Sequence, residues 1–371
     1  MKRRLTSALV MLLAFALLIG TTAITASAET TTYTPIGGSA AFIKNLVVDS
    51  DANIPSISFK YTSRRGTPQD ATATTIEILA ATTGGEVSDA VFSNDDTASA
   101  IPGVPTDDRS HPTPGKKYAQ KSVTVNFPDG TFTKPGVYRF VISETNNNLP
   151  GVTYDSNPTR YLDVFVVADD NNVLSVNSYV LRDAATDIGT DGKYVEDPGV
   201  KSSGYINSLT QYDFDFSKTI SGNQADKNKR FNFTLTITGA NPGTYSIIAN
   251  DVTGNPTSIT VGANGTATNE YSLTNGSTVK VIGLNAGAVC NVTEDPDDYT
   301  ATHILDSGNA VSGNSSGAVT LDSDHSVAFT NTRNGIIPTG IIMTIAPFAI
   351  GICVFGAVFI FIICRKKRRS Y

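Results

Sequence analysis

Cysteine, histidine and tryptophan are scarce in this chain of 371 residues, which has three cysteines, three histidines and no tryptophan. Cys353 and Cys364 lie in an apolar run near the C-terminus, so Cys290 is the only cysteine in the long middle part. An internal disulfide is therefore excluded there, and extra stability must come from another device. The dispersed histidines show neither metal-ligand spacing nor a catalytic arrangement, so no metal, no cofactor and no enzyme activity are expected.

Amphipathic helical periodicity is also missing between residues 29 and 340. Short runs instead alternate apolar and polar residues, as at 41–48, 136–142 and 161–167, and Asn-Gly pairs at 264–265 and 275–276 interrupt them. This period of two predicts β-strands with one buried face. The expected fold class is all-β, with two tandem Ig-like β-sandwich domains.

Basic residues are in the minority in the same region. The chain has 28 Lys and Arg against 34 Asp and Glu, but eight basic residues lie in the two end segments, which leaves 20 against 34 and a formal charge of −14. A surface of this charge disfavours nucleic acid and anionic lipid as partners. The charge suits an extracellular protein that must repel crowded neighbours.

Both ends of the chain carry targeting signals. Three basic residues, an apolar stretch and a small-residue pattern at 26–28 predict a signal peptide over residues 1–28. The 24 uncharged residues from 341 to 364 predict a C-terminal transmembrane helix, and the basic segment 365–371 predicts a cytoplasmic tail. A plain single-pass membrane protein is the alternative. The Pro-Thr-Gly peptide at 338–340, just outside the run, weighs against it.

The strand pattern occurs twice, in a first unit at 29–207 and a second at 208–335. The linker at 208–213 is short, so the two domains should stack end to end. Each unit has a Lys on its first strand, a Glu on a later apolar strand and an Asn on its last strand. In chain order these residues are Lys44, Glu144 and Asn207, then Lys218, Glu294 and Asn331.

Lys, Glu and Asn brought together in an apolar core have the chemistry for an isopeptide bond. Burial disfavours charged forms, so it lowers the pKa of a lysine and raises that of a glutamate. The neutral amine attacks the asparagine carbonyl, while the carboxyl group relays protons and ammonia leaves. Taken singly, each of the six residues is more often a surface or turn residue, and the repeated order is what favours a cross-link.

Several motifs resemble the major (backbone) pilins of Gram-positive sortase-assembled pili, in particular the two-domain streptococcal type. They are Phe132–Tyr138, Leu149–Asp155, Lys218–Gly222, Val292–Asp295, Phe329–Asn331 and the peptide Ile337-Pro338-Thr339-Gly340. The resemblance implies a bond from Lys44 to Asn207 assisted by Glu144. It also implies a bond from Lys218 to Asn331 assisted by Glu294.

The resemblance further implies how the chain is processed and assembled. The sorting motif at 336–340 is similar to the Val-Pro-Thr-Gly variant that pilus sortases accept, which places cleavage between Thr339 and Gly340 and the new bond on a lysine of the next copy. Lys201 is the expected acceptor, with Lys193 in reserve. The implied partners are a pilus sortase, further copies of the chain, ancillary pilins and cell-wall peptidoglycan, with the membrane only a transient anchor. The alternative is a wall-anchored adhesin or accessory pilin that binds a host ligand.

Overall fold

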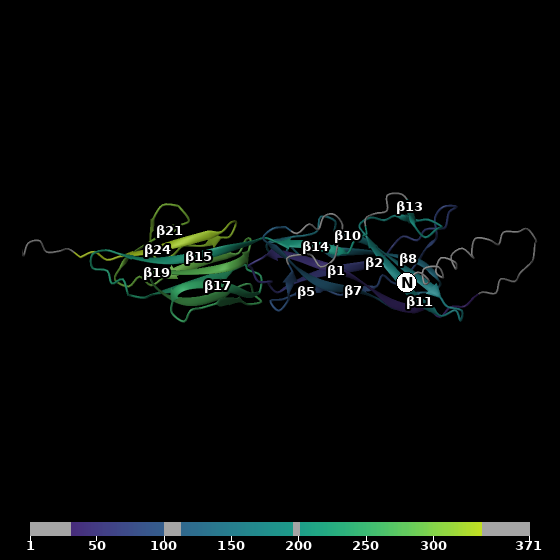
Figure 1. The fold of residues 1–371 in the computed structure, drawn as a ribbon, viewed down its shortest axis with the longest axis horizontal. Coiled ribbons are helices and arrows are strands. Elements are labelled where there is room, and N and C mark those ends of the chain that lie inside the picture. Colours follow the sequence, from purple (N-terminus) through teal and green to yellow (C-terminus); the bar gives the residue numbers. More distant parts are fainter. Residues whose placement is uncertain (1–30, 100–112, 196–200, 336–371) are drawn as a thin grey trace, which may run out of the picture.

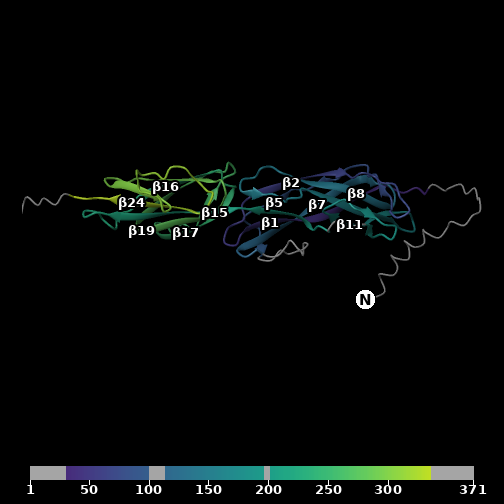
Figure 2. The same ribbon diagram turned by 90° about the horizontal axis from the view of Figure 1, so that it is seen from above.

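The molecule is built from β-strands arranged in two bodies. The computed structural model describes residues 31–99, 113–195 and 201–335, and every regular element within these ranges is a strand. The two bodies lie in line along the long axis of the molecule (Figures 1 and 2). Each has its own hydrophobic core, one formed between Ala40 and Leu209 and the other between Phe214 and Phe329. The all-β, two-sandwich prediction is therefore confirmed.

Four segments predicted from the sequence lie outside the described residues. They are the signal peptide 1–28, the sorting motif 336–340, the apolar run 341–364 and the basic tail 365–371. Among the residues that are described, no helix is long and apolar enough to cross a membrane.

The N-terminal domain is a sandwich of two sheets. Its strands are β1 (Ile36–Asp49), β2 (Ile57–Arg65), β3 (Ile78–Leu79), β4 (Glu86–Val87), β5 (Ala90–Phe92), β6 (Ala98–Ser99), β7 (Lys116–Phe132), β8 (Gly136–Thr145), β9 (Val152–Thr153), β10 (Thr159–Ala168), β11 (Leu174–Arg182), β12 (Asp187–Ile188), β13 (Tyr194–Val195) and β14 (Gly204–Leu209). One sheet has the order β4-β7-β1-β14-β9, with β6 also on β7. The other has the order β11-β10-β8-β2-β5, with β3 on β8, while β12 and β13 form a separate hairpin.

The C-terminal domain is formed by one wrapped sheet. Its strands are β15 (Gln211–Ser221), β16 (Phe231–Thr238), β17 (Gly243–Val252), β18 (Ser258–Val261), β19 (Ala267–Asn285), β20 (Val289–Glu294), β21 (Thr300–Leu305), β22 (Val311–Ser312), β23 (Val319–Thr320) and β24 (His325–Thr332). The order is β22-β21-β24-β15-β19-β16-β20-β23, and β17 joins β19 and carries β18. The long β19 pairs with β16 through its first half and with β15 through its second. The break expected at Asn275-Gly276 is therefore a bend within one strand, where Gly276 has a φ of +89°.

The first and last strands of each domain are parallel neighbours. In the N-terminal domain β1 pairs with β14, and in the C-terminal domain β15 pairs with β24. Parallel pairing requires a long connection between the two strands, and here the rest of the domain provides it. This topology brings the two ends of each domain's chain together in one sheet.

The linker between the domains is shorter than the sequence indicated. The expected linker at 208–213 is reduced to Thr210, because Ser208 and Leu209 still pair with β9 while Gln211 already pairs with β19. Continuous strand pairing on both sides of one residue leaves little freedom for the domains to swing.

Direct hydrogen bonds across the junction restrict the domains further. Ser56 N donates to Pro242 O at 2.7 Å. The Asn94 side chain exchanges two hydrogen bonds with the backbone of Thr244, one at 2.7 Å and one at 2.9 Å. These contacts involve backbone groups of β17 and the loop before it, so they fix the orientation of the C-terminal sheet relative to the first domain.

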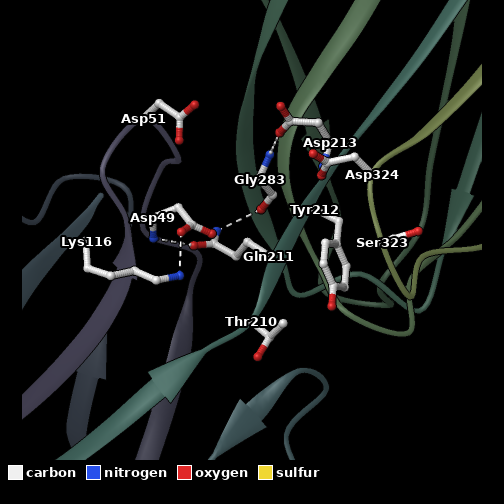
Figure 3. A pocket seen from close by; sticks show the side chains of 10 residues that line it. All are labelled: Asp49, Asp51, Lys116, Thr210, Gln211, Tyr212, Asp213, Gly283, Ser323 and Asp324. Atoms are coloured by element: carbon white, nitrogen blue, oxygen red, sulfur yellow. Dashed lines mark hydrogen bonds and ion pairs between the residues drawn. The ribbon is translucent and has the colours of Figure 1, made fainter. Parts of the chain in front are cut away.

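A pocket of about 540 Å³ opens at the junction and is lined by residues of both domains (Figure 3). Its polar groups largely bind one another. Asp49 N donates to Gln211 Oε1 at 3.1 Å, and Gln211 Nε2 donates to Gly283 O at 2.7 Å. Lys116 Nζ lies 2.5 Å from Asp49 Oδ1. Gln211 thus connects the domains, and we interpret the pocket as part of a structural joint.

Candidate cross-linking sites

The first candidate site lies between the first and last strands of the N-terminal domain. Alternate side chains of β1 point into the core, and Lys44 occupies one place in this otherwise apolar row with 0% of its surface exposed. On the parallel strand β14, Tyr205 lies opposite Lys44 and Asn207 lies opposite Leu46. Because side chains two positions apart share a face, Lys44 and Asn207 both point into the sandwich.

Glu144 reaches the same point from the opposite sheet, near the end of β8. Lys44 Nζ donates to Glu144 Oε1 at 2.5 Å, and Asn207 Nδ2 donates to the same oxygen at 3.1 Å. Asn207 Oδ1 accepts a hydrogen bond from Asp155 N at 2.8 Å. The second carboxylate oxygen, Glu144 Oε2, is buried and has no hydrogen-bond partner among the described residues. One carboxylate oxygen therefore connects the amine to the carboxamide.

The C-terminal domain repeats this arrangement with the same register. Phe329 of β24 lies opposite Lys218 of β15, and Asn331 lies opposite Ile220. Lys218 Nζ pairs with Glu294 Oε1, and Asn331 Nδ2 donates to that oxygen at 2.7 Å. Within the described part of the chain, Glu294 Oε2 and Asn331 Oδ1 are buried without partners. The sequence repeat thus corresponds to a repeat in three dimensions.

Aromatic rings cover both lysines, and the sequence analysis assigned them no role. Lys44 Nζ lies 4.5 Å from the centre of the Phe59 ring, and Lys218 Nζ lies 4.5 Å from that of Phe231. These rings shield the amines from water and add only a modest cation–π attraction. The signal that could have found them is a pair of aromatic residues, two positions apart and so on the same face, on the second long strand of each unit. The pairs are Phe59 with Tyr61 and Phe231 with Phe233.

Burial shifts the pKa values of both lysines and of Glu294 in the direction that favours their neutral forms. Desolvation lowers the pKa of Lys44 to about 8, although the charge of Glu144 opposes the shift. Desolvation also lowers the pKa of Lys218 to about 8, against the hydrogen bond and charge of Glu294. The pKa of Glu294 is raised, again mainly by desolvation. Each lysine therefore has a substantial neutral fraction, which is the nucleophilic form, near pH 8.

The expected acceptor lysines lie apart from both clusters. Lys201 is exposed, and its backbone forms a bridge to Arg182 at the end of β11. Lys193 lies in the turn between β12 and β13, where 83% of its side-chain surface is exposed. Both amines are accessible to another protein. Thr339 and the rest of the predicted cleavage peptide lie outside the described residues.

Comparisons with known proteins match both domains. Residues 56–194 match a family described as a Spy0128-like isopeptide containing domain. Residues 212–333 match a family described as a domain of unknown function, DUF7601. A pilin of Streptococcus pyogenes serotype M1 is 30% identical over 266 residues, which cover 67% of this chain and 73% of the relative.

Solved structures show a similar fold. The crystal structure of the N168A mutant of the major pilin from Streptococcus pyogenes covers 81% of this chain and 100% of its own, with 23% identity and a TM-score of 0.51. The T3.2 major pilin of the same species covers 80% of this chain and 99% of its own, with 20% identity and a TM-score of 0.50. The fold of most of this chain is thus found in solved proteins.

The fold and the two sites define an elongated structural protein made of two β-sandwich domains, each with a buried Lys–Glu–Asn cluster. The identity and coverage of the streptococcal relative then give the family: the chain belongs to the pilins. This confirms the resemblance inferred from the sequence motifs. The chain is accordingly a structural subunit of a surface fibre rather than an enzyme, and its location is extracellular.

Proposed function

We propose that this pilin is the shaft subunit of a covalently assembled pilus, and that each of its domains closes its own Lys–Asn isopeptide bond. One observation carries the proposal. In both domains the asparagine of the last strand lies opposite the residue two positions after the lysine of the first strand. One oxygen of a buried glutamate contacts the lysine amine and the asparagine amide nitrogen. Two such sites with matching geometry argue against a chance cluster of buried polar residues.

The bond forms in a single turnover. In the N-terminal domain the neutral amine of Lys44 attacks the carboxamide carbon of Asn207. Glu144 accepts a proton from the attacking nitrogen and delivers it to the departing one, because Oε1 is hydrogen-bonded to both. The bond from the carboxamide carbon to its nitrogen breaks, and the products are one secondary amide and one ammonia. The corresponding residues of the C-terminal domain react in the same way.

The two bonds would replace the disulfides that this chain lacks. Each joins the first strand of a domain to the last, and so closes a loop of more than a hundred residues. By the chain-entropy argument used for disulfides, closing about 100 residues stabilises the folded state by about 4 to 5 kcal/mol. An amide bond, unlike a disulfide, is not broken by reducing agents.

Assembly uses a second amide bond between copies. A pilus sortase would cut the peptide bond between Thr339 and Gly340 and pass the Thr339 carbonyl to Nζ of Lys201 in the next copy. The Gly340 nitrogen takes up a proton, and the membrane segment is released with it. The exposure of Lys201 supports this assignment. Ancillary pilins and peptidoglycan are the further partners of such a fibre.

The intact mass of the exported part, residues 29–335, tests the internal bonds. Each bond expels one ammonia of about 17 Da, so the wild type should be about 34 Da lighter than its sequence mass. Lys44→Ala and Lys218→Ala should each be about 17 Da lighter than their own sequence masses, because each retains one site. A wild type of full sequence mass would contradict the bonds.

Variants of the full chain, produced in the bacterium that encodes it, test the assembly step. Thr339→Ala and Lys201→Ala should each abolish the ladder of high-mass polymers seen by immunoblot. Lys193→Ala is the matched control and should leave the ladder intact. Loss of the ladder in Lys193→Ala alone would identify Lys193 as the acceptor. A wild type without any ladder would favour the alternative of a wall-anchored adhesin.

A further inference from the structure

The turn after β15 holds the chain that leaves the C-terminal domain. The last residue pair between β15 and β24 joins Ser221 to Thr332. Beyond this pair, Arg333 N donates to Ser221 O at 3.0 Å, and Gln224 N donates to Arg333 O at 3.2 Å. The chain therefore stays bound to the domain after the sheet has ended.

Asn223 makes the outermost of these contacts. Its Nδ2 donates to Gly335 O at 3.1 Å, and its Oδ1 accepts from Gly335 N at 2.8 Å. The side-chain amide thus binds both backbone groups of one residue, as a neighbouring strand would. Asn223 N also donates to Asn334 Oδ1 at 3.3 Å. We call residues 221–224 together with residues 333–335 the exit clamp.

A glycine allows the two halves of the exit clamp to approach each other. Gly222 has a φ of +104°, and a Cβ at this position would lie 2.2 Å from Arg333 O. Any other residue would separate the turn from the departing chain. The close approach therefore depends on the absence of a side chain at this position.

Only a short length of chain separates the exit clamp from the proposed cleavage site. Gly335 is held, and the residues between it and the bond after Thr339 are 336–339. Four residues span at most about 14 Å when fully extended. An enzyme that encloses Thr339 must therefore touch the end of the C-terminal domain.

Ion pairs order the surface beside the exit clamp. Arg333 Nη2 lies 2.7 Å from Asp298 Oδ2, and its guanidinium lies 5.7 Å from the centre of the Tyr299 ring. Lys229 Nζ pairs with Asp297 and lies 3.7 Å from Asp298 Oδ1. These side chains offer fixed charges of both signs next to the departing chain.

We propose that the exit clamp and the adjoining charges of Lys229, Asp297 and Asp298 form the docking surface for the transpeptidase that cuts after Thr339. Asn223 is a positioning residue in this site. It holds the chain so that the enzyme meets the cleavage peptide and the domain surface at the same time. This inference rests on the proposed function, because it concerns the enzyme that performs the assembly step.

The test follows loss of residues 340–371 by pulse-chase, with the full chain produced in its own bacterium. Asn223→Ala should slow this cleavage by about threefold to tenfold, the size expected when a preorganising hydrogen bond is lost. Insertion of Gly-Ser-Gly-Ser after Gly335 should slow it to a similar degree, although the clamp itself stays intact. Asn223→Asp keeps the oxygen that accepts from Gly335 N but replaces the donor to Gly335 O by a second acceptor, so its cleavage should be slowed as well.

Two controls separate the possible outcomes. Asn264→Ala removes another exposed turn amide, which accepts from Thr266 N at 3.2 Å, and should be cleaved at the wild-type rate. Thr339→Ala should not be cleaved, and its normal processing would instead refute the proposed function. If Thr339→Ala is blocked while Asn223→Ala and the insertion variant are cleaved at or above the wild-type rate, the docking proposal is wrong and the assembly role stands. An unchanged mass deficit in the Asn223→Ala domain would show that the domain still folds.

Discussion

Unpaired atoms in the cluster of the C-terminal domain suit the proposed role of the carboxyl group. Buried polar atoms without partners are rare and often functional, and Glu294 Oε2 and Asn331 Oδ1 are two such atoms in one cluster of the described chain. A protonated Glu294 would have a hydrogen to donate to the asparagine oxygen, which would make the carboxamide carbon more electrophilic. Burial raises the pKa of Glu294 and so favours that protonated form.

The lowered pKa of Lys218 leads to a prediction for a variant that cannot form the bond. In Asn331→Ala the Lys218 amine cannot form the amide bond and remains a titratable group in the core. Its pKa is about 8 in the folded state, against an ordinary value of 10.5. Between these values the unfolded chain binds a proton that the folded chain has lost, so the free energy of unfolding rises with pH. We expect the Tm of Asn331→Ala to rise from pH 8 to pH 10 relative to a reference variant.

The reference is the double variant Asn331→Ala with Lys218→Met, which lacks the titrating amine and keeps a side chain of similar length. Thermal unfolding of both proteins across the same pH series isolates the lysine from the other titrating groups. The cross-linked wild type should lack the effect, because its nitrogen at residue 218 is an amide. A constant Tm difference between the two variants would mean that Lys218 has an ordinary pKa in the folded state.

At the level of single residues, the sequence predicted which polar side chains come together but not which side chains surround them. Lys44, Glu144 and Asn207 could be singled out because a polar residue interrupts an apolar row, and because the second domain repeats their order. Phe59 could not be singled out by itself, because an aromatic residue on a strand is the ordinary content of a core, and only its pairing with Tyr61, repeated in the second domain, marks it. Its contact with Lys44 depends on which strand of the other sheet lies across the sandwich, and that is a tertiary property.

The strand elements were predicted more fully than their pairing. Alternation identified β1, β8 and β10 directly, since their inward positions are apolar. The parallel pairing of β1 with β14 could not be derived from local pattern, because more than a hundred residues separate the two strands. The bend of β19 was also missed, because an Asn-Gly pair signals a hairpin turn as readily as a bend.

The strand β20 contains a probe for opening of the C-terminal domain. Cys290 is 0% exposed, and burial raises the pKa of its thiol to about 12, so the reactive thiolate is scarce. Labelling by a thiol reagent therefore requires the domain to open. In residues 29–335 we expect slow labelling in the wild type and labelling at least about tenfold faster in Lys218→Ala, since a cross-link of this loop size suppresses opening.

Lys44→Ala provides the matched control for this experiment. It removes the same bond from the other domain, whose core does not include Cys290. Its labelling rate should equal that of the wild type. Acceleration in both variants would show that the two domains open together. Acceleration in neither would mean that the C-terminal bond does not limit opening.

Across the whole molecule, the proposed bonds define a path for tension. In the fibre, load would enter each copy at Lys201 and leave at Thr339. From Lys201 it would follow β14, the one-residue linker and β15 to Lys218, and then cross the internal bond to Asn331. Nearly all of the N-terminal domain lies before residue 201, outside this path. The two internal bonds therefore have different mechanical roles, although their chemistry is the same.

Stretching single fibres built from each variant tests this asymmetry. Without the bond at Lys218, roughly 110 residues enter the loaded path, and each copy should lengthen by roughly 370 Å once the C-terminal domain unfolds. Fibres of the wild type should show no such step. The measurement is the step length per copy in force–extension traces.

Fibres of Lys44→Ala are the decisive comparison, because there the load meets only the last strand of the N-terminal domain. Without its bond to β1, β14 is held by strand pairing and packing alone, and because a strand already rises about 3.3 Å per residue, peeling it away should lengthen each copy by only a few ångströms. Long steps in these fibres would mean that tension enters the N-terminal domain well before β14. Such a result would exclude Lys201 as the acceptor and place the junction between copies earlier in the N-terminal domain.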